Sequence, residues 1–499
     1  MASVSVVLAD SAVPAPAAPI AAAPEQLGRR ILGNSLVQLV IPALKIFTGL
    51  GTAAILSRYL GVRSYGAYGV ILAYVAIFIG VFNEWGLSTI ALREISRRPA
   101  ERPRILASAA SLQATISVAT YGLLVLGLLF VDYPVEVKIG CAVMGLMLLF
   151  TPLDILALSF QADLKLVRLL PINVAMSLLG FALVVALVLL HAGLVALIAS
   201  GLLTSVVAYS VITRMVIRRE QGMPGPTISD WLPLLKESWP LAVNTIFSTV
   251  MTQGPLLLLA FYSLRSAGLY AAASKLPLQL ILLPLIIRTS TFPVLSRSWV
   301  AEPRRFGRQL NMLMAGSILV ALPALFAGIG LAPLVVRLLF GRGFVDATLP
   351  FQFLVVMAVI LIPLILVGEA MIAAGFQRTN LAIQAVNLPF FIALGWLLAA
   401  RYGAAGVSAA LAMSYFALLV AHFVAARVRM RDLAPTAPLL PAVVATAAGT
   451  AVMVAGRPLD AGVVGLAAAA VATSVFVVLQ RTEIRALVAT VRGRAGAPA

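Results

Sequence analysis

The stretch AILSRYLGVRSYGAYGVILAYVAIFIGVFNEWGLSTIALREISRR, residues 54–98, indicates the class of fold. It holds the end of one apolar segment, a Gly-rich corner, a second apolar segment and an Arg-rich exit. The second segment, between the corner at 63–68 and Arg93, has about 20–25 residues, the length that an α-helix needs to cross a bilayer. We interpret the stretch as a turn between two membrane-spanning helices.

The composition extends this interpretation to the whole chain. Of its 499 residues, 62% are hydrophobic and 11% are charged, and the mean hydropathy is +1.05. A soluble domain has about one quarter of its residues charged. Apolar runs of about 20 residues recur from 31 to 480, whereas a transmembrane β-barrel has short alternating segments. We therefore predict an all-α polytopic membrane protein.

Fourteen apolar segments are long enough to be transmembrane helices. They lie at residues 31–56, 67–92, 105–130, 138–160, 169–190, 193–215, 239–262, 268–293, 309–333, 348–373, 381–400, 404–426, 437–455 and 461–480. With the N-terminus inside, 25 of the 36 Lys and Arg residues fall in cytoplasmic segments, 8 in external segments and 3 within spans. Because Lys and Arg collect in cytoplasmic loops, we predict an even number of spans and cytoplasmic termini. The same bias accounts for the net charge of +18, so no nucleic-acid partner is predicted.

An internal repeat divides the chain into two halves. The corner RSYGAY at 63–68 recurs as RSAGLY at 265–270, an offset of 202 residues. The Pro- and Gly-containing segment 217–238 lies between the sixth and seventh spans, where a linker between two pseudo-symmetric halves is expected, and transporters commonly bind their substrate between such repeats. The predicted units are a disordered cytoplasmic tail at 1–28, six-helix bundles at 29–216 and 239–430 around a central cavity, the cytoplasmic linker at 217–238, a helix pair at 431–480 and a cytoplasmic tail at 481–499.

Lys45 lies halfway through the first predicted span. An ionisable side chain at this depth costs about 2.5–3.5 kcal/mol, so it requires a specific environment. The helical period places Gln38, Thr48 and Thr52 on the same face as Lys45. Either this face lines a water-filled cavity, or Lys45 snorkels or pairs with an acid of a neighbouring helix. Its depth favours the cavity.

The second half carries a comparable polar face. Span seven contains six polar residues within ten positions, which is more than helix packing usually needs. Lys275 lies in the outer third of span eight, and Gln279 lies one turn away. We predict that Lys45 and Lys275 form a cationic cavity whose polar lining is Gln38, Thr52, Asn244, Ser248, Thr252 and Gln279.

Other charged residues have two interpretations each. Arg58, at the predicted outer surface, is either a plain interfacial charge or a third cation that reaches into the mouth of the cavity. Glu84, Asp154 and Glu369 lie within spans, near their inner ends. They either pair with nearby Arg residues and cap backbone groups, or they couple transport to protons or other cations.

The sequence lacks the motifs of several enzyme classes. It has no G-x-x-x-x-G-K-[ST] loop for ATP hydrolysis. Its two histidines and single cysteine cannot form a His/Cys metal cluster. The loops are too short to hold a catalytic domain. We therefore predict a protein that is not an enzyme and has neither a cofactor nor a metal site.

Several motifs together resemble those of a known family. The corner A-x-x-L-S-R-Y-L-G-V-R-S-Y-G-A-Y-G (53–69) is followed in order by WGLSTIALREISR (85–97), GLYAAASKL (268–276), LLFGRGF (338–344), AAGFQRTN (373–380) and RYGAAGVSAA (401–410). They resemble the polysaccharide-biosynthesis flippases of the Wzx type, which share a superfamily with the multidrug and toxin extrusion (MATE) exporters and the lipid flippase MurJ. The resemblance covers about residues 28–430.

The resemblance implies two six-helix bundles around a V-shaped cavity that opens to either side in turn. It implies an undecaprenyl-diphosphate-linked oligosaccharide as substrate, moved from the inner to the outer leaflet of a bacterial plasma membrane for exopolysaccharide or O-antigen synthesis. Lys45, Lys275 and Arg58 would neutralise the diphosphate. The implied partners are this lipid, membrane lipids and a polysaccharide polymerase. The alternatives are a cation-coupled exporter of drugs or metabolites, which would need a deep acid facing the cavity, and a non-transporting scaffold.

Overall fold

The computed structural model describes residues 24–163, 166–219, 225–281, 295–299, 302–430, 433, 435–457 and 459–491. Side chains are described from residue 41 onward, except at 42, 166, 219, 240, 244, 281, 487 and 489–491. Within this part of the chain the secondary structure is helical and no β-strand is present, which confirms the predicted all-α class.

The helices follow one another through short connections. In the first half they are α1 (Pro24–Phe78), η1 (Ile79–Asn83), α2 (Leu87–Arg97), η2 (Pro99–Glu101), α3 (Arg102–Gly127), α4 (Val135–Gly145), η3 (Leu146–Phe150), α5 (Pro152–Ala162), η4 (Leu166–Leu169), α6 (Leu170–Leu189) and α7 (Leu194–Arg219). The second half holds η5 (Ile228–Asp230), α8 (Trp231–Tyr262), α9 (Leu264–Ser274), η6 (Pro277–Ile281), α11 (Pro303–Phe340), η7 (Arg342–Ala347), α12 (Thr348–Ala373) and α13 (Gln377–Met430). The chain continues with α14 (Leu439–Ala455), α15 (Ala461–Leu479) and α16 (Arg481–Val491). Nine helices in the described residues are long and apolar enough to cross a membrane, or ten if α4–η3 and α5 form one bent span.

Two of these helices are each two helices joined at a bend. Gly61 bends α1 with a φ of 70°, and Gly403 bends α13 with a φ of 53°, a conformation that glycine adopts without steric cost. The second half has the equivalent bend at Ser263, between α8 and α9, 202 residues after Gly61. The sequence repeat therefore corresponds to a repeated helix–bend–helix unit. The count of 14 spans stays a prediction, because the eighth, 268–293, extends into residues 282–294, outside the described part.

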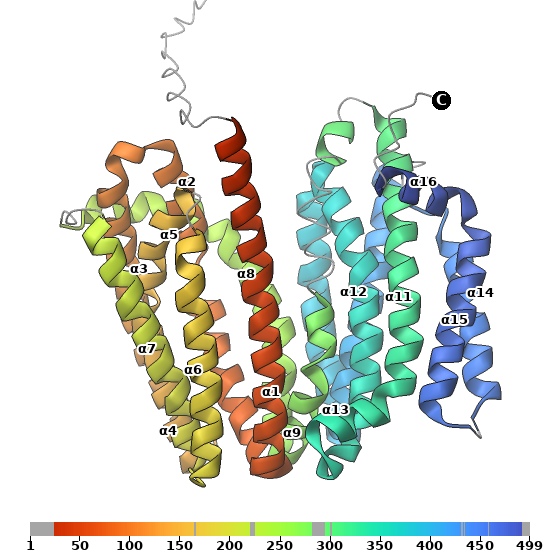
Figure 1. The fold of residues 1–499 in the computed structure, drawn as a ribbon, viewed down its shortest axis with the longest axis horizontal. Coiled ribbons are helices and arrows are strands. Elements are labelled where there is room, and N and C mark those ends of the chain that lie inside the picture. The colour runs from red at the N-terminus through yellow and green to blue at the C-terminus, as the bar shows by residue number, and fades with distance from the viewer. Residues whose placement is uncertain are drawn as a thin grey trace, which may run out of the picture.

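Buried hydrophobic side chains in the described residues form one shared core, two separate ones and a small cluster of Leu361, Leu364 and Leu418. The shared core joins Leu56 and Val70 of α1 to Leu259 of α8 and Phe340 of α11. A second core lies among α2, α3, α5, α7 and the start of α8, and a third among α11 to α15. The two bundles therefore meet where α1 bends and α9 begins, and we name this the corner end. Each bundle has its own core toward the opposite end, where α1 begins and α16 lies, and we name this the terminal end (Figure 1).

The two copies of the repeat contact each other at the corner end. Helices α1 and α9 cross there with their backbones in direct contact. A Cβ atom on Gly66 would lie 1.9 Å from the carbonyl oxygen of Leu264, and one on Gly268 would lie 2.0 Å from the carbonyl oxygen of Val62. Small residues permit this approach, which is common at helix crossings in membranes. Two glycines from the repeated motif therefore close the corner end.

The second predicted span, 67–92, ends earlier than the sequence indicated. The helix changes to the π-helix η1, which ends at Asn83, and α2 begins only at Leu87. Gly86 separates them with a φ of 73°. Hydropathy did not reveal the break, because apolar residues continue on both sides of it, up to Phe82 and again from Leu87 and Ile90 onward.

Polar side chains of neighbouring helices compensate this break. Gln113 of α3 donates a hydrogen bond to the carbonyl oxygen of Asn83 at 3.1 Å. The Asn83 side chain accepts from Ser117 at 2.9 Å and donates to Thr151 at 3.0 Å. Since Asn83 is buried, unpaired groups here would cost about 1–3 kcal/mol each. These hydrogen bonds explain why the polar residues Asn83, Gln113 and Ser117 can be buried in an otherwise apolar bundle.

The connection between the two halves is shorter than the predicted linker, 217–238. Helix α7 extends to Arg219 and α8 begins at Trp231, so helix occupies both ends of that segment. Asp230, directly before α8, forms an ion pair with Arg104 of α3 at 3.0 Å. The start of α8 is therefore attached to the first bundle, although its sequence belongs to the second half.

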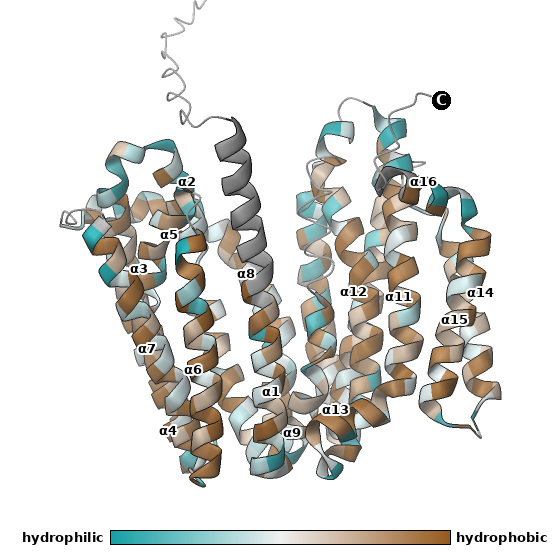
Figure 2. Ribbon diagram, viewed as in Figure 1, coloured by the Kyte–Doolittle hydropathy of each residue, from teal (hydrophilic) through white to brown (hydrophobic). Residues whose placement is uncertain are grey.

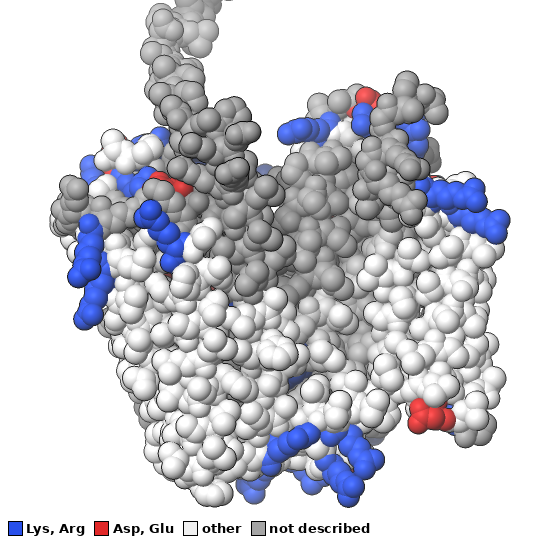
Figure 3. Space-filling view, in the orientation of Figure 1, with Lys and Arg blue, Asp and Glu red and all other residues white. Residues whose placement is uncertain are grey.

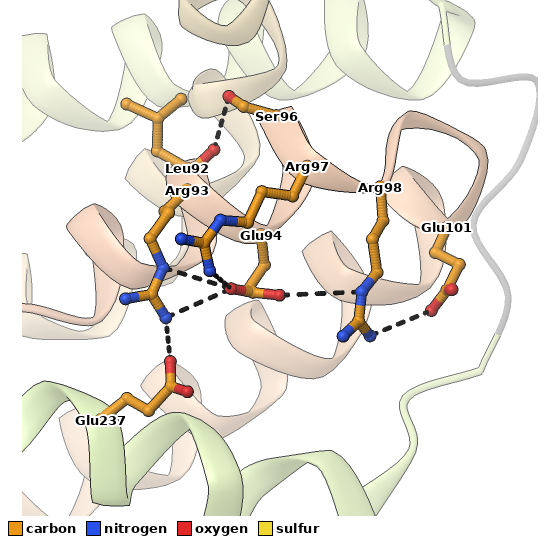
Figure 4. Close-up of polar contacts among 8 residues, drawn as sticks. All are labelled: Leu92, Arg93, Glu94, Ser96, Arg97, Arg98, Glu101 and Glu237. Carbon is orange, nitrogen blue, oxygen red and sulfur yellow. Dashed lines mark hydrogen bonds and ion pairs between the residues drawn. The ribbon is translucent and has the colours of Figure 1, made fainter. Parts of the chain in front are cut away.

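An ion-pair cluster also joins α8 to α2 (Figure 4). Arg93 of α2 bonds both Glu94 of its own helix and Glu237 of α8. Glu94 also faces Arg97 at 3.6 Å and Arg98 at 3.9 Å. Because most of these side chains are solvent-exposed, each pair contributes at most about 1 kcal/mol. The cluster therefore orients α2 and α8 at the terminal end more than it stabilises them.

The C-terminal helix pair packs on the outside of the second bundle. Helices α14 and α15 lie close to the bounds predicted for spans 13 and 14. A Cβ atom on Gly330 of α11 would lie 2.5 Å from the Cα of Gly465, so α11 and α15 also cross with backbones in contact. Both predicted tails contain helix in part: α1 begins at Pro24, within 1–28, and α16 occupies the beginning of 481–499.

The outer surface has the properties of a membrane protein. Hydrophobic residues cover the flanks of the helices, and hydrophilic residues gather near both ends (Figure 2). On the face shown in Figure 3, Lys and Arg also lie mainly at the two ends. Large apolar side chains such as Val118 and Leu178 are more than half exposed, at 63% and 51%. The protein is therefore a multi-pass membrane protein.

We expect Gly66→Ala and Gly268→Ala to destabilise the purified protein by about 1–3 kcal/mol each, because the added Cβ overpacks the α1–α9 crossing. The measurement is the thermal unfolding midpoint in detergent. Gly122→Ala is the matched control, since nothing lies within 4 Å of a Cβ at that position in α3. Equal midpoints for all three variants would contradict the proposed packing.

Candidate functional site

A cavity of about 340 Å³ lies among the helices of the first bundle. Lys45, Thr48 and Thr52 line it from the first part of α1, Ser177 from α6 and Thr204 from α7. The periodic polar face of the first predicted span is thus the face that α1 presents to this cavity. Lys45 is exposed, and its side chain is part of the lining of this cavity.

A second cavity of about 180 Å³ lies between α1, α8, α9 and η6. Thr252 and Gln253 line it from α8, Ser274 and Lys275 from the end of α9, and Gln279 from η6. Polar residues of the second half therefore converge on one space. The bend at Ser263 makes this possible, because it turns α9 back beside α8.

The two cavities share a wall. Tyr65, Tyr68 and Leu72 of α1, together with Lys275, line both of them. The rings of Tyr65 and Tyr68 stack with centroids 6.1 Å apart, and Tyr65 meets Phe344 of η7 edge-on at 5.8 Å. We name the two cavities and this wall the central site. It is built by both bundles, directly beside the crossing that closes the corner end.

The electrostatic character of the central site is positive. Among the described residues, neither Lys45 nor Lys275 has an ion-pair or hydrogen-bond partner, and no Asp or Glu lines either cavity. A cation removed from water without compensation is costly. A negatively charged ligand between the two bundles would supply that compensation.

The predicted polar lining is only partly assembled in the central site. Thr52, Thr252 and Gln279 line it. Ser248 is exposed on α8 and lines neither cavity, although its carbonyl oxygen accepts the Thr252 hydroxyl at 2.8 Å. The predicted lining residues whose side chains lie outside the described part are Gln38 and Asn244.

Arg58 lies at the corner end and lines neither cavity. Its guanidinium donates a hydrogen bond to the carbonyl oxygen of Leu338, near the end of α11, and its side chain lies beside Gly341. In the same region Arg265 pairs with Asp346 of η7 at 2.9 Å. Arg58 therefore connects the two bundles from an exposed position, and its role as a third cation of the cavity stays a prediction.

The three predicted acids lie outside the central site. Glu84 is exposed beyond the π-helix, and Glu369 of α12 is buried. Asp154 of α5 is exposed, accepts a hydrogen bond from Tyr209 at 3.0 Å, and is close enough to Lys45 for their charges to interact. Within the described part of the chain, no three His, Cys, Asp or Glu side chains are grouped so that they could hold a metal ion.

Sequence reasoning missed the aromatic wall and part of the polar lining. Tyr68 and Tyr270 are the final residues of the repeated R-S-x-G-x-Y pattern, which we interpreted only as a turn. That repetition was the signal available for both residues. Ser177 and Thr204 had no comparable signal, because neither belongs to the repeated pattern.

Solved structures with this fold are membrane transport proteins. The chain matches the lipid II flippase MurJ in an inward closed conformation with a TM-score of 0.72 and 15% identity, over 91% of this chain and 99% of that one. It matches an inward-facing MATE multidrug-resistance transporter with a TM-score of 0.64 and 15% identity, over 80% and 98%. For the MATE transporter VcmN of Vibrio cholerae the TM-score is 0.54 and the identity 16%, over 82% and 99%. The chain therefore has a fold similar to those of MurJ and the MATE transporters.

The sequence itself identifies the family. The profile of the family described as polysaccharide biosynthesis protein matches residues 55–349, which is more than half of the chain. The protein belongs to this family. A comparison with curated proteins gave no match. The matched segment includes both copies of the repeat and Lys275, and it begins ten residues after Lys45.

We expect a cysteine introduced at Thr52 to react several-fold faster with a negatively charged thiol reagent than with a positively charged reagent of similar size. The unpaired lysines attract the anion, and free cysteine in solution gives the intrinsic ratio. Lys45→Gln should lower this ratio, whereas Lys236→Gln, an exposed lysine of α8, should leave it unchanged. The native Cys141 is buried and contributes little background. A ratio equal to that of free cysteine would contradict a positive central site.

Proposed function

We propose that the protein is a flippase for an undecaprenyl-diphosphate-linked oligosaccharide, which it moves from the inner to the outer leaflet of a bacterial plasma membrane for surface polysaccharide synthesis. One observation carries this proposal: Lys45 from the first bundle and Lys275 from the second line one central site, and no Asp or Glu among the described residues lines that site. Two such cations complement a diphosphate with about two negative charges, because each compensates the desolvation cost of the other.

The remaining lining suits the rest of such a substrate. Thr48, Thr52 and Thr204, which line the larger cavity, supply groups that hydrogen-bond sugar hydroxyls. The polyprenyl chain would stay in the bilayer and pass between the bundles. Membership of a polysaccharide biosynthesis family supports a sugar-bearing lipid as the substrate.

Alternating access would use the difference between the two ends of the molecule. The excess of Lys and Arg in the segments assigned to the cytoplasm supports cytoplasmic termini, so the terminal end would face the cytoplasm. The closed corner end would then face the outside, where Arg58 bonds Leu338 and the two glycines cross. Release of the substrate outward requires these contacts to separate. A polysaccharide polymerase would consume the product at that side.

A second candidate function is a cation-coupled exporter of drugs or metabolites. Asp154 favours it, because an exposed carboxylate that interacts with the charge of Lys45 is a plausible cation site. The acid lies outside both cavities of the central site, and this places the flippase first.

The test is translocation of a fluorescent undecaprenyl-diphosphate oligosaccharide in reconstituted vesicles. We expect transport by the wild type and at least a tenfold loss in Lys45→Ala and in Lys275→Ala, because each change leaves the diphosphate without one counter-charge. Lys236→Ala is the matched control, since it removes an exposed lysine of α8 that lines neither cavity.

Two results would reject the flippase. One is a wild type that leaves the lipid in place but exchanges protons for cationic drugs, with the exchange lost in Asp154→Asn. The other is full transport by both lysine variants, provided that all variants unfold at the wild-type temperature.

A further inference from the structure

Two tyrosines that line a cavity together with Lys275 have hydroxyls that are buried without a partner. Tyr65 and Tyr270 are 1% and 2% exposed, and neither hydroxyl has a hydrogen-bond partner within the described part of the chain. Both residues line the second cavity, the 180 Å³ space that also holds Lys275. An orphaned buried donor costs free energy, so a native protein retains it for a reason, such as a ligand that is absent from the free state.

The serine and threonine hydroxyls of this cavity differ from the two tyrosines. Thr252 donates to the carbonyl oxygen of Ser248 at 2.8 Å, and Ser274 donates to the carbonyl oxygen of Ala271 at 3.2 Å. Their own helices therefore already satisfy them. The tyrosines are too long and too rigid to reach back to a carbonyl of the preceding turn. The donors left over in this cavity are consequently the hydroxyls of Tyr65, Tyr68 and Tyr270, the ammonium of Lys275 and the amides of Gln253 and Gln279.

This set of donors suits an oxyanion. Phenolic hydroxyls and an ammonium group donate to phosphate oxygens, and bonds to an ionised acceptor are roughly twice as strong as neutral ones. No acid lines the cavity to compete for these donors. A volume of 180 Å³ is about six times that of one water molecule, so it admits a small anionic group but no oligosaccharide.

We propose that the second cavity is the diphosphate subsite, in which Tyr65 and Tyr270 donate hydrogen bonds to phosphate oxygens held by Lys275. This inference rests on the proposed flippase function and specifies its substrate contacts. The larger cavity then receives the sugar, and Lys45, which lines that cavity together with Lys275, still compensates part of the diphosphate charge from the other side of the shared wall. Tyr65 and Tyr68 line both cavities, so they mark the boundary between phosphate and sugar.

The test compares binding of undecaprenyl diphosphate and of undecaprenol to the full-length protein in nanodiscs. Tyr65→Phe and Tyr270→Phe remove only the hydroxyl. We expect each to weaken binding of the diphosphate lipid by about tenfold and to leave binding of the alcohol unchanged. Inorganic diphosphate as a competitor separates the two sources of the group: competition shows that the subsite takes the free anion, and its absence restricts the subsite to the lipid headgroup.

Tyr74→Phe is the matched control, because the buried Tyr74 hydroxyl already donates to the carbonyl oxygen of Leu124 at 3.1 Å. It should lower the thermal unfolding midpoint and leave the affinity unchanged. Tyr65→Phe should show the reverse, with an unchanged or higher midpoint without ligand and a lower affinity. A purely structural hydroxyl at Tyr65 would lower the midpoint and leave the affinity unchanged, which would overturn the proposal.

The outcomes separate the subsite from the proposed function. Wild-type affinity in both tyrosine variants, or an equal loss for undecaprenol, overturns the subsite even if the wild type transports the oligosaccharide. Tyrosine-dependent binding of the diphosphate lipid by a protein that fails to transport it supports the subsite and rejects the flippase. A wild type that binds no diphosphate lipid overturns both.

Discussion

The backbone contact between Gly66 and Gly268 sets the geometry on which the rest of the molecule depends. Each Cβ-free surface lies against a carbonyl of the other helix, so α1 and α9 approach more closely than any side chain would allow. This contact draws residues of both bundles into one shared core at the corner end. Toward the terminal end each bundle buries its own apolar residues, and helix α8 is attached to the first bundle by Asp230 and Glu237.

The central site is a direct consequence of this crossing. Tyr65 and Tyr68 flank Gly66 in the sequence, and Tyr270 follows Gly268 by two residues. The close approach of the helices brings these aromatic rings and Lys275 together around the second cavity. An unpaired cation that is removed from water there carries a desolvation cost. Any motion that separates the bundles at the corner end must also separate ligand-facing groups of the two halves. In the proposed function, closure and binding would thus depend on the same few residues of the repeated motif.

The sequence was sufficient for properties that local pattern determines. Apolar runs placed most helices correctly, and the repeat located the equivalent bends at Gly61 and Ser263. Contacts between distant residues could not be predicted: Arg58 bonds Leu338, 280 positions away, and nothing near Arg58 indicates that carbonyl. The early end of the second span was also hidden, because Asn83 is satisfied by side chains of other helices. The sequence indicated Lys45 and Lys275 separately, as ionisable residues within predicted spans, but only the fold brings both of them to the central site.

The repeat is symmetric in backbone and asymmetric in chemistry. At the offset of 202 residues, the position equivalent to Lys45 is Phe247 and the position equivalent to Lys275 is Ala73. Each bundle therefore contributes one cation, from a different helix of its repeat unit, and the two differ in burial. A two-fold site would bind a ligand equally well in two opposite orientations. The two unequal cavities share Lys275 and an aromatic boundary, and Lys45 lines the larger one alone. In the proposed function this difference would distinguish the two ends of an elongated ligand, so that a substrate with one charged and one neutral polar end would be held in a single orientation.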